Sequence, residues 1–347
     1  MNFINKGRNL VVYQSVWGDK VFPELSIEVN SEKSPSSYRI VGNPENAGDI
    51  IKKFYMIENI PLFDKQYAKA VSGNGDEKKK ILTLHSSSRL ALLTFYNVDA
   101  EHILSLDING ESIDFDFSTF EFKNPVIGYP SNMDVVLVSQ DRKSVFFLES
   151  KFSEYYLSAG MKSAPISTQY ATNKYSHWFY DSEWLASIGI NNSYDHEDKS
   201  QKKFELFMKD NQINYLDGFK QMISHYIGIR RRIDEKKRIT SDQNSAENKR
   251  ISDVVLSVVE DPESKIYLGE ILFDNLHLSD VCEGELDPQE VLKNYGNLYS
   301  KLAAKMNECI YADGLADRFI VLNKELKYSD ILGSLAYIEP ITMYFYG

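Results

Sequence analysis

Several features that would quickly narrow the class of this protein are scarce in its sequence. Only two cysteines occur, Cys282 and Cys309, and they lack CxxC spacing, so neither a disulfide framework nor a zinc cluster is expected. No apolar run approaches the roughly 18 residues that span a bilayer. Residues 1–20 show neither an uninterrupted apolar segment nor a small-residue cleavage site. We therefore expect a cytoplasmic protein with no membrane partner.

Positive charge is also in short supply. The 347 residues include 39 Lys and Arg against 50 Asp and Glu, which gives a net charge of −11. Diffuse positive charge therefore does not supply nucleic-acid affinity, because phosphate neutralisation requires clustered Lys and Arg. The clearest local cluster, within 228–250, contains Arg230, Arg231, Arg232, Lys236 and Lys237. This cluster is typical of a solvated helix end with a polar loop, and the alternative is an edge that contacts phosphates.

What is present is a globular composition, with 43% hydrophobic residues and neither an internal repeat nor a low-complexity tract. Helix signals, mostly caps before apolar residues at helical spacing, occur at residues 43–58, 85–97, 213–232 and 287–311. Residues 154–211 should form helices and loops. Hairpins are expected at three places: at Asn109-Gly110, over 131–152, and at Asp261-Pro262. Helices interleaved with hairpins favour an α/β class with a mixed sheet.

The hairpin of 131–152 carries charge where a buried strand should not. Side chains alternate along a strand, so Glu149 and Lys151 share one face while apolar residues bury the other. If 140–143 form the loop, the register sets Asp134 opposite Glu149. Two carboxylates with Cβ atoms about 5 Å apart repel each other in a half-buried sheet. A divalent cation relieves that repulsion, and oxygen-rich sites favour Mg²⁺, with Mn²⁺ possible.

Lys151 adds a positive charge on the same face, a combination suited to metal-assisted hydrolysis, in which a lysine orients water or stabilises developing charge. Glu-x-Lys alone is not specific, because the chain contains eight such triplets. Only Glu149 combines a buried strand, the lysine and an acid in register. The nearest rival is Glu121 with Asp107 upstream, but the Asn109-Gly110 turn pairs Asp107 with Ser112 instead. The alternative is that Asp134 and Glu149 cap strand ends or pair with nearby lysines.

Asp134, followed by Glu149-Ser150-Lys151 on the next strand, resembles the motif of the PD-(D/E)XK nuclease superfamily, which has the restriction-endonuclease-like fold. Met133 stands before the acid in place of proline, a departure that many members share. The resemblance implies an αβββαβ core with a central mixed sheet flanked by helices. It also implies that Asp134, Glu149 and the Ser150 carbonyl bind the metal and that Lys151 is the catalytic lysine.

The resemblance divides the chain into three parts. Residues 81–235 would form the nuclease core, 1–80 an N-terminal elaboration packed on it, and 236–347 a C-terminal region that extends the sheet and adds helices. Many members carry a further glutamate before the motif, and Glu121 is the candidate here, with an ordinary solvent-facing residue as the alternative. Gln221 and His225, four apart on the expected helix of 213–232, would touch the site, or else form an ordinary helix flank.

These observations lead to a functional expectation. The chain should be a Mg²⁺-dependent endonuclease that hydrolyses phosphodiester bonds in DNA, such as a type II restriction enzyme or a defence or repair nuclease. Cutting both strands would favour a homodimer. The competing expectation is a non-catalytic nucleic-acid-binding or scaffold protein that keeps the nuclease fold.

Overall fold

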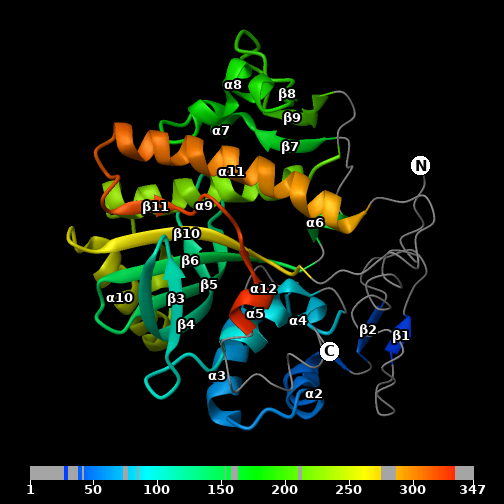
Figure 1. Cartoon of the computed structure of the whole chain (residues 1–347), viewed down its shortest axis with the longest axis vertical. Coiled ribbons are helices and arrows are strands. Elements are labelled where there is room, and N and C mark those ends of the chain that lie inside the picture. The colour runs from blue at the N-terminus through cyan, green and yellow to red at the C-terminus, as the bar shows by residue number, and fades with distance from the viewer. Residues whose placement is uncertain are drawn as a thin grey trace.

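A large mixed β-sheet organises the computed structural model of this chain (Figure 1). The structure describes residues 27–29, 38–40, 43–72, 77–83, 86–152, 154–157, 163–209, 213–274 and 287–332. The strand order is β11-β10-β6-β5-β4-β3, and β12 also pairs with β10. The strand bounds are β3 Leu104–Ile108, β4 Glu111–Asn124, β5 Ser131–Ser139, β6 Ser144–Lys151, β10 Lys265–Leu272, β11 Phe319–Val321 and β12 Leu326–Lys327.

The strands from β3 to β6 are antiparallel, whereas β10 runs parallel to β6, β11 and β12. Asn109 and Gly110 have φ angles of 56° and 83°, which are the values that a two-residue type I′ hairpin requires. The turn pairs Ile108 with Glu111 and Asp107 with Ser112, as expected. A mixed sheet flanked by helices is therefore confirmed at the level of the α/β class.

Helices cover both faces of this sheet. On one face, α9 (Leu216–Glu235) and α10 (Ala246–Glu260) enclose Val136, Val138 and Phe147, and α11 (Pro288–Ala312) packs along α9 and β11. On the other face, α3 (Ile60–Ala70) and α5 (Ser87–Phe95) enclose Val135, Leu137 and Phe146. The alternation along β5 and β6 thus sends successive side chains into two separate cores.

The remaining elements are short. They are α2 Ala47–Phe54, α4 Glu77–Lys80, α6 Glu154–Leu157, α7 Thr168–Ala171, α8 Ser182–Ser187, α12 Tyr328–Leu332, the 3-10 helices η2 Pro44–Asn46, η3 His177–Tyr180 and η5 Thr240–Asp242, and the strands β1 Ile27–Val29, β2 Tyr38–Ile40, β7 Ala164–Ser167, β8 Ile190–Asn192 and β9 Lys203–Met208. Among the described residues, no helix combines the length and apolarity needed to cross a membrane.

The helix expectations are confirmed, with small shifts of their ends. Ser86 caps α5 by accepting a hydrogen bond from the Arg89 backbone N–H, while His85, expected beside this cap, lies outside the described residues. The expected apolar stripe of 213–232, from Phe219 to Ile227, is buried on α9. Helix α11 extends one residue beyond the expected end at 311.

Two expectations about secondary structure are wrong. The segment before Asp261-Pro262 is the helix α10 and not a strand, so β10 pairs in parallel with β6 instead of closing a hairpin. Ser245 caps α10 through the Asn248 backbone N–H, and residues such as Ile251 and Val255 bury a helical stripe that overrides their β propensity. In addition, the region 154–211 contains a three-stranded sheet, β7-β9-β8, as well as helices and loops.

Candidate active site

The hairpin of β5 and β6 has the expected register. Val135 pairs with Leu148 and Val138 with Val145, so Asp134 stands opposite Glu149. The Ser150 backbone N–H donates a 2.8 Å hydrogen bond to Oδ2 of Asp134. The N–H and C=O of one residue point to the same side of a strand, so the Ser150 carbonyl also faces β5. The three expected metal-binding groups therefore lie on neighbouring positions of the hairpin.

Lys151 and His225 both reach the Glu149 carboxylate. Nζ of Lys151 donates to Oε1 of Glu149, and Nε2 of His225 lies 2.9 Å from Oε2. All three residues are buried, each with 3% of its surface exposed. We call Asp134, Glu149, Lys151 and His225 the acid–lysine cluster. It joins the hairpin to the middle of α9.

The acid–lysine cluster leaves hydrogen-bonding capacity unused. Oε2 of Glu149 and Nε2 of His225 form a 2.9 Å ion-pair contact whose geometry falls short of a hydrogen bond, and Nδ1 of His225 has no hydrogen-bond partner within the described chain. Buried polar atoms are nearly always satisfied in folded proteins. Unsatisfied atoms of this kind are expected where a ligand completes the site.

The charges in the cluster are unequal. Burial and the neighbouring carboxylates of Glu149 and Glu121 raise the pKa of Asp134 well above its ordinary value, against the smaller effect of Lys151. Burial alone would also raise the pKa of Glu149, but Lys151 and His225 outweigh it and hold this pKa at about 2. Burial opposes the charge of Lys151, yet the Glu149 carboxylate keeps the pKa of Lys151 raised. Neighbouring acids with pKa values displaced in opposite directions are typical of catalytic sites.

Glu121 lies on β4, next to Asp134 of β5. The pairs Phe120–Val135 and Phe122–Met133 flank it on both sides, which sets Glu121 opposite Asp134 in the ladder. Its φ of 50° is left-handed, a strained conformation for a residue with a side chain inside a strand. Glu121 is buried and accepts a 3.0 Å hydrogen bond from Nδ2 of Asn132, so the solvent-facing alternative is wrong.

Gln221 lies one turn before His225 on α9, but it meets a different partner. Its Oε1 accepts a 3.4 Å hydrogen bond from the hydroxyl of Tyr215, which is buried near Lys151. The structure therefore brings His225 directly to Glu149, whereas Gln221 borders the cluster through Tyr215.

Glu270 is a site residue that the sequence reasoning missed. It pairs with Glu149 across the parallel ladder of β6 and β10, and its two carboxylate oxygens accept hydrogen bonds of 2.9 and 2.7 Å from Tyr295 of α11. Burial, together with the charge of Glu149, raises the pKa of Glu270 to about 8, against the opposing effects of Lys151 and Tyr295. The available signal was an acid inside the apolar run YLGEILF, the same anomaly that marked Glu149.

Glu121, Asp134, Glu149 and Glu270 occupy consecutive positions across β4, β5, β6 and β10, and we call them the carboxylate row. No group of three or more His, Cys, Asp or Glu side chains in the described residues is arranged to hold a metal ion. Magnesium does not require such a group, because it keeps several waters and is usually bound by one or two carboxylates. The neighbouring carboxylates of Asp134 and Glu149 have the oxygen chemistry that suits a hard divalent cation.

Two arginines of the basic segment at the end of α9 fit neither interpretation of it. Arg230 and Arg232 are buried, with 3% and 1% of their surfaces exposed. Arg232 forms a two-contact ion pair with Asp242 and donates to two backbone carbonyls, while Arg230 pairs with Asp234 and Asp313. We call these five residues the arginine cluster. Its guanidinium groups lie neither in solvent nor at a surface that could contact phosphates.

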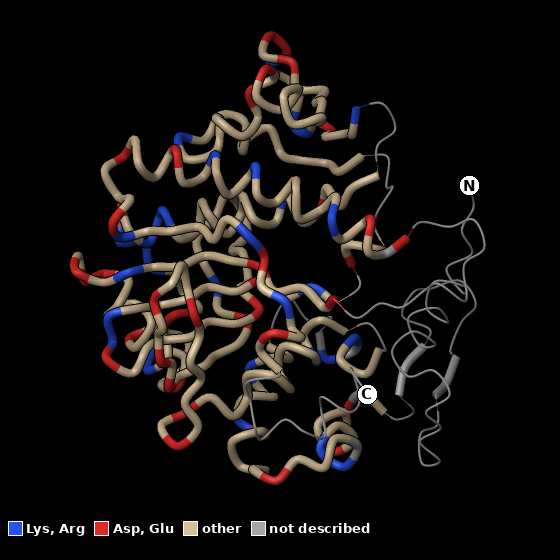
Figure 2. Tube along the Cα trace, viewed as in Figure 1, with Lys and Arg blue, Asp and Glu red and all other residues tan. Residues whose placement is uncertain are grey.

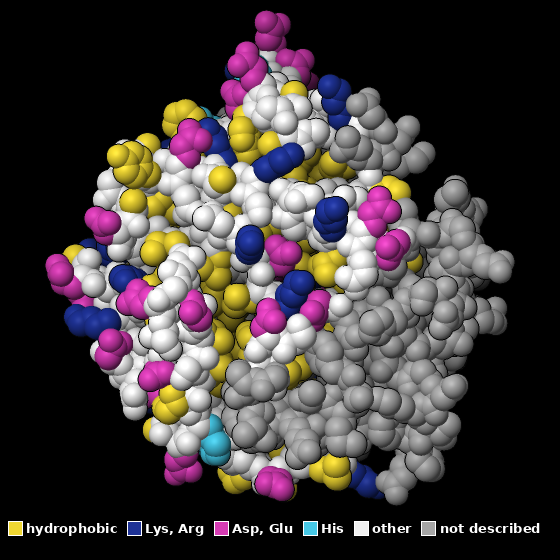
Figure 3. Space-filling view, in the orientation of Figure 1, with side chains coloured by type: hydrophobic (Ala, Val, Ile, Leu, Met, Phe, Trp, Pro, Cys, Tyr) yellow, Lys and Arg dark blue, Asp and Glu magenta, His cyan; other side chains and the backbone are white. Residues whose placement is uncertain are grey.

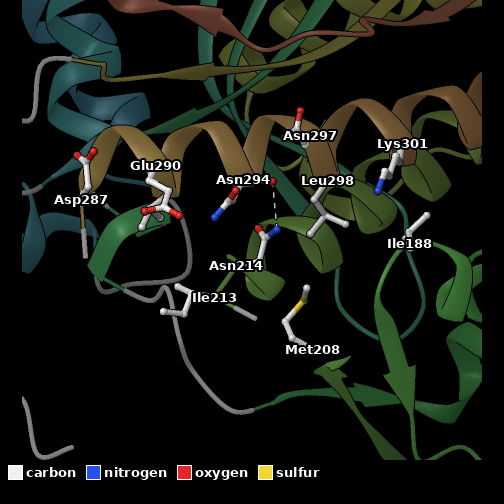
Figure 4. Close-up of a pocket in the computed structure, with 11 residues that line it drawn as sticks. Ile188, Met208, Ile213, Asn214, Asp287, Glu290, Asn294, Asn297, Leu298 and Lys301 are labelled. Carbon is white, nitrogen blue, oxygen red and sulfur yellow. Dashed lines mark hydrogen bonds between the residues drawn. The ribbon is translucent and has the colours of Figure 1, made fainter. Parts of the chain in front are cut away.

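A cavity of about 540 Å³ lies beside the acid–lysine cluster but does not contain it. It is bordered by the start of α9, by α11 and by the small sheet. Figure 4 shows Asn214 and Asn294 near its centre, Asp287 and Glu290 at one end and Lys301 at the other. The next residues along the chain, Tyr215 and Tyr295, pack ring against ring toward the cluster.

Comparisons with protein-family models, with curated proteins and with solved structures return no significant match. Membership of the PD-(D/E)XK superfamily therefore stays a prediction. It depends on the motif Asp134, Glu149-Ser150-Lys151 and on the geometry described above.

Proposed function

We propose that this protein is a divalent-metal-dependent nuclease that hydrolyses phosphodiester bonds in DNA. The observation that carries the proposal is the meeting of Asp134, Glu149 and Lys151 on adjacent strands, with unsatisfied polar atoms at the point where they meet. If β3, the elements between β6 and α9, and α10 are treated as insertions, the elements α5, β4, β5, β6, α9 and β10 follow the αβββαβ order that the resemblance implies, although β10 lies beyond the expected core of 81–235.

Each residue has a chemical role in this proposal. Asp134 and Glu149 supply carboxylate oxygens, and the Ser150 carbonyl faces the same gap. A bound Mg²⁺ or Mn²⁺ would activate water and shield the phosphate charge. Lys151, held by Glu149, places a positive charge beside the reacting phosphate, where developing negative charge needs stabilisation.

The mixed surface charge is consistent with DNA binding through a few specific contacts and not through diffuse electrostatic attraction. Lys and Arg are interspersed with Asp and Glu over the coloured part of the trace in Figure 2. On the face shown in Figure 3, both signs are interspersed over the described residues. DNA would therefore be held by a few placed contacts, and its affinity would depend on salt less steeply than that of a strongly basic protein.

A second function is favoured by the burial of the site. Glu149 and Lys151 are almost inaccessible and bonded to each other, as a structural ion pair would be. A DNA-binding or scaffold protein that keeps the fold without catalysis would show the same pair. A purely structural pair, however, does not account for the buried Nδ1 of His225, which has no hydrogen-bond partner in the described residues.

The test compares two variants of the complete chain. Lys151→Met should reduce cleavage of plasmid DNA by about a thousandfold or more, because a positioned charge at a reacting phosphate is worth that much, while metal binding survives. Asp134→Asn removes a proposed ligand, so metal binding by calorimetry and cleavage should fail together. The exposed Lys327, in the unrelated triplet Glu325-Leu326-Lys327, provides the matched control Lys327→Met.

Thermal melting separates lost function from lost folding, since Lys151→Met leaves the Glu149 carboxylate without its ammonium partner. If the folded wild-type protein binds no divalent metal and cleaves no DNA, the nuclease proposal is wrong and the scaffold function replaces it.

A further inference from the structure

The cavity bordered by α11, the start of α9 and the small sheet has two chemically different walls. Polar side chains recur every three or four residues from the cap of α11 onward and therefore share one face of the helix: Asp287, Glu290, Asn294, Asn297 and Lys301. Across the cavity from α11 in Figure 4 lie the half-buried apolar side chains of Ile188, Met208 and Ile213. A polar wall that faces an apolar wall suits a flat ligand with a polar edge.

Asn294 and Lys301 have side chains that are free to bind such a ligand. Asn214 is occupied, because its Nδ2 donates a 3.1 Å hydrogen bond to the Asn294 carbonyl and its Oδ1 accepts one of 2.8 Å from the Tyr215 backbone N–H. The half-buried side-chain amide of Asn294 has no hydrogen-bond partner among the described residues. Lys301 has no ion pair there either, whereas Lys305, one turn further along α11, forms one.

The spacing of these two side chains matches one nucleotide. Asn294 and Lys301 are seven residues apart, so they lie on the same side of α11, about 10 Å apart along its axis. In Figure 4 both extend from the helix toward the apolar wall. A carboxamide offers the donor and the acceptor that pair with the edge of a nucleobase, adenine above all. An ammonium group binds phosphate, and the separation is that between the base edge and the phosphate of a nucleotide.

The charges at the two ends of the cavity fix the direction of the ligand. Asp287 and Glu290 repel a phosphate at one end, and Lys301 attracts it at the other. The base then lies near Asn294, where Met208 across the cavity offers its thioether to the ring, a favourable contact. An extended peptide fits less well, because the apolar wall would leave the N–H and C=O groups on that side without partners.

We propose that this cavity binds a single nucleotide, with its base at Asn294 and its phosphate at Lys301. A free nucleotide and a nucleotide unstacked from a DNA strand share this chemistry. Only the second source rests on the proposed nuclease function. The rings of Tyr215 and Tyr295, with centroids 5.2 Å apart, stand between the cavity and the acid–lysine cluster. A strand cleaved at that cluster would therefore enter the cavity with one base turned out of its stack.

Calorimetry without metal tests the site on the complete chain, with dAMP, dGMP, dCMP, dTMP and the four corresponding nucleosides as probes. The wild type should bind at least one of the four nucleotides. Asn294→Leu should weaken binding of that nucleotide and of its nucleoside by about fivefold to a hundredfold, the range for losing a paired base edge. Lys301→Gln should weaken nucleotide binding by up to about fivefold, as expected for an exposed ion pair, and leave nucleoside binding unchanged.

Two lysines on the same helix provide matched controls. Lys293 is exposed and adjacent to Asn294 but does not line the cavity, and Lys305 is held in its own ion pair. Lys293→Leu and Lys305→Gln should bind the nucleotide as the wild type does. The proposal is wrong if the wild type binds no nucleotide, or if Asn294→Leu and Lys301→Gln both bind it with unchanged affinity.

Short single-stranded oligonucleotides distinguish the two sources. If a strand supplies the nucleotide, an oligonucleotide should bind more tightly than the free nucleotide and lose affinity in Asn294→Leu. If Asn294→Leu changes only the binding of the free nucleotide, the cavity is a site for a free nucleotide. A wild type that cleaves DNA but binds no nucleotide would refute this site and keep the nuclease function. Nucleotide binding without any cleavage would keep the site and refute the nuclease function.

Discussion

Helix α9 contacts two buried charge clusters that differ in how completely they are satisfied. In the arginine cluster, the terminal nitrogens of Arg230 and Arg232 all have partners, and the Nε atoms of both arginines lack a hydrogen bond in the described residues. In the acid–lysine cluster, a carboxylate oxygen and both nitrogens of an imidazole lack hydrogen bonds in the described residues. The first cluster ties α9 to β4 and to the segment before α10, and each of its guanidinium groups has a carboxylate counter-charge.

This difference in hydrogen bonding distinguishes a charge cluster that stabilises the fold from one that serves a function. A buried ion pair that is fully bonded is stable only as a unit, so removal of one partner is costly. A cluster that crowds carboxylates and leaves polar atoms open is strained without a ligand, and proteins keep such strain where it serves function. The two clusters should therefore respond oppositely to the same substitution.

The largest effect is expected from neutralising one aspartate in each cluster. Asp242→Asn should lower the free energy of unfolding by about 3–5 kcal/mol, because it leaves the Arg232 guanidinium buried without a counter-charge. Asp134→Asn should leave stability unchanged or raise it, because the raised pKa of Asp134 shows that the folded protein disfavours its charge. Urea unfolding at neutral pH measures both variants. Equal losses would show that the acid–lysine cluster is an ordinary structural ion pair.

A pH series extends the comparison to Glu270. Its pKa is raised from 4.5 to about 8, so the neutral form stabilises the fold below pH 4.5, and this contribution is lost as the pH rises toward 8. Relative to Glu270→Gln, the wild type should lose a few kcal/mol of unfolding free energy between pH 5 and pH 8.5, since each unit is worth about 1.4 kcal/mol.

The exposed Glu308 on the same helix as Tyr295 provides the control. The difference between the wild type and Glu308→Gln should stay flat over this range. A flat difference for Glu270→Gln as well would place the Glu270 carboxyl in a solvated environment, against the burial described above.

Local rules account for the part of the site that the sequence predicted. The loop of 140–143 sets the β5–β6 register, and from that register Asp134 and Glu149 follow by counting. His225 follows from helix periodicity, because it lies on the α9 face turned to the sheet. In each case the chain segment that carries the information is short.

Long-range pairing accounts for what was missed. No turn connects β6 with β10, so the position of Glu270 beside Glu149 depends on a parallel crossover of more than a hundred residues and on how α10 packs. The valines of α10 favour a strand by propensity, and this segment forms a helix because the helix buries them against the sheet. Tyr295 contacts Glu270 because Gly218 leaves room for it, which no local pattern encodes.

A third prediction concerns His225, which distinguishes the acid–lysine cluster from a simple ion pair. His225→Gln should weaken Mn²⁺ affinity by about tenfold to a hundredfold, the usual cost of losing a residue that orients a metal ligand. Calorimetry measures this effect without any cleavage assay. Ser224→Ala is the control: Ser224 lies beside His225 on α9, and its hydroxyl is bonded to Tyr170 of α7 and not to the cluster, so this variant should bind Mn²⁺ as the wild type does. Unaltered affinity in His225→Gln would make the imidazole a packing residue.

The smallest effect concerns DNA contacts at the end of α9, where the arginine cluster gives way to exposed lysines. Arg230 and Arg232 are buried in ion pairs, so the part of the basic segment that can reach phosphates includes Lys236 and Lys237. The double variant Lys236→Gln/Lys237→Gln should weaken DNA binding modestly and reduce the slope of log affinity against log salt by at most about 2, since each phosphate contact contributes about 0.9. Fluorescence anisotropy at several salt concentrations measures the slope, with the exposed Lys324→Gln as the control. A slope that equals that of the wild type would return these lysines to the solvated helix end that their composition first suggested, and DNA contacts would have to be sought nearer to Asp134.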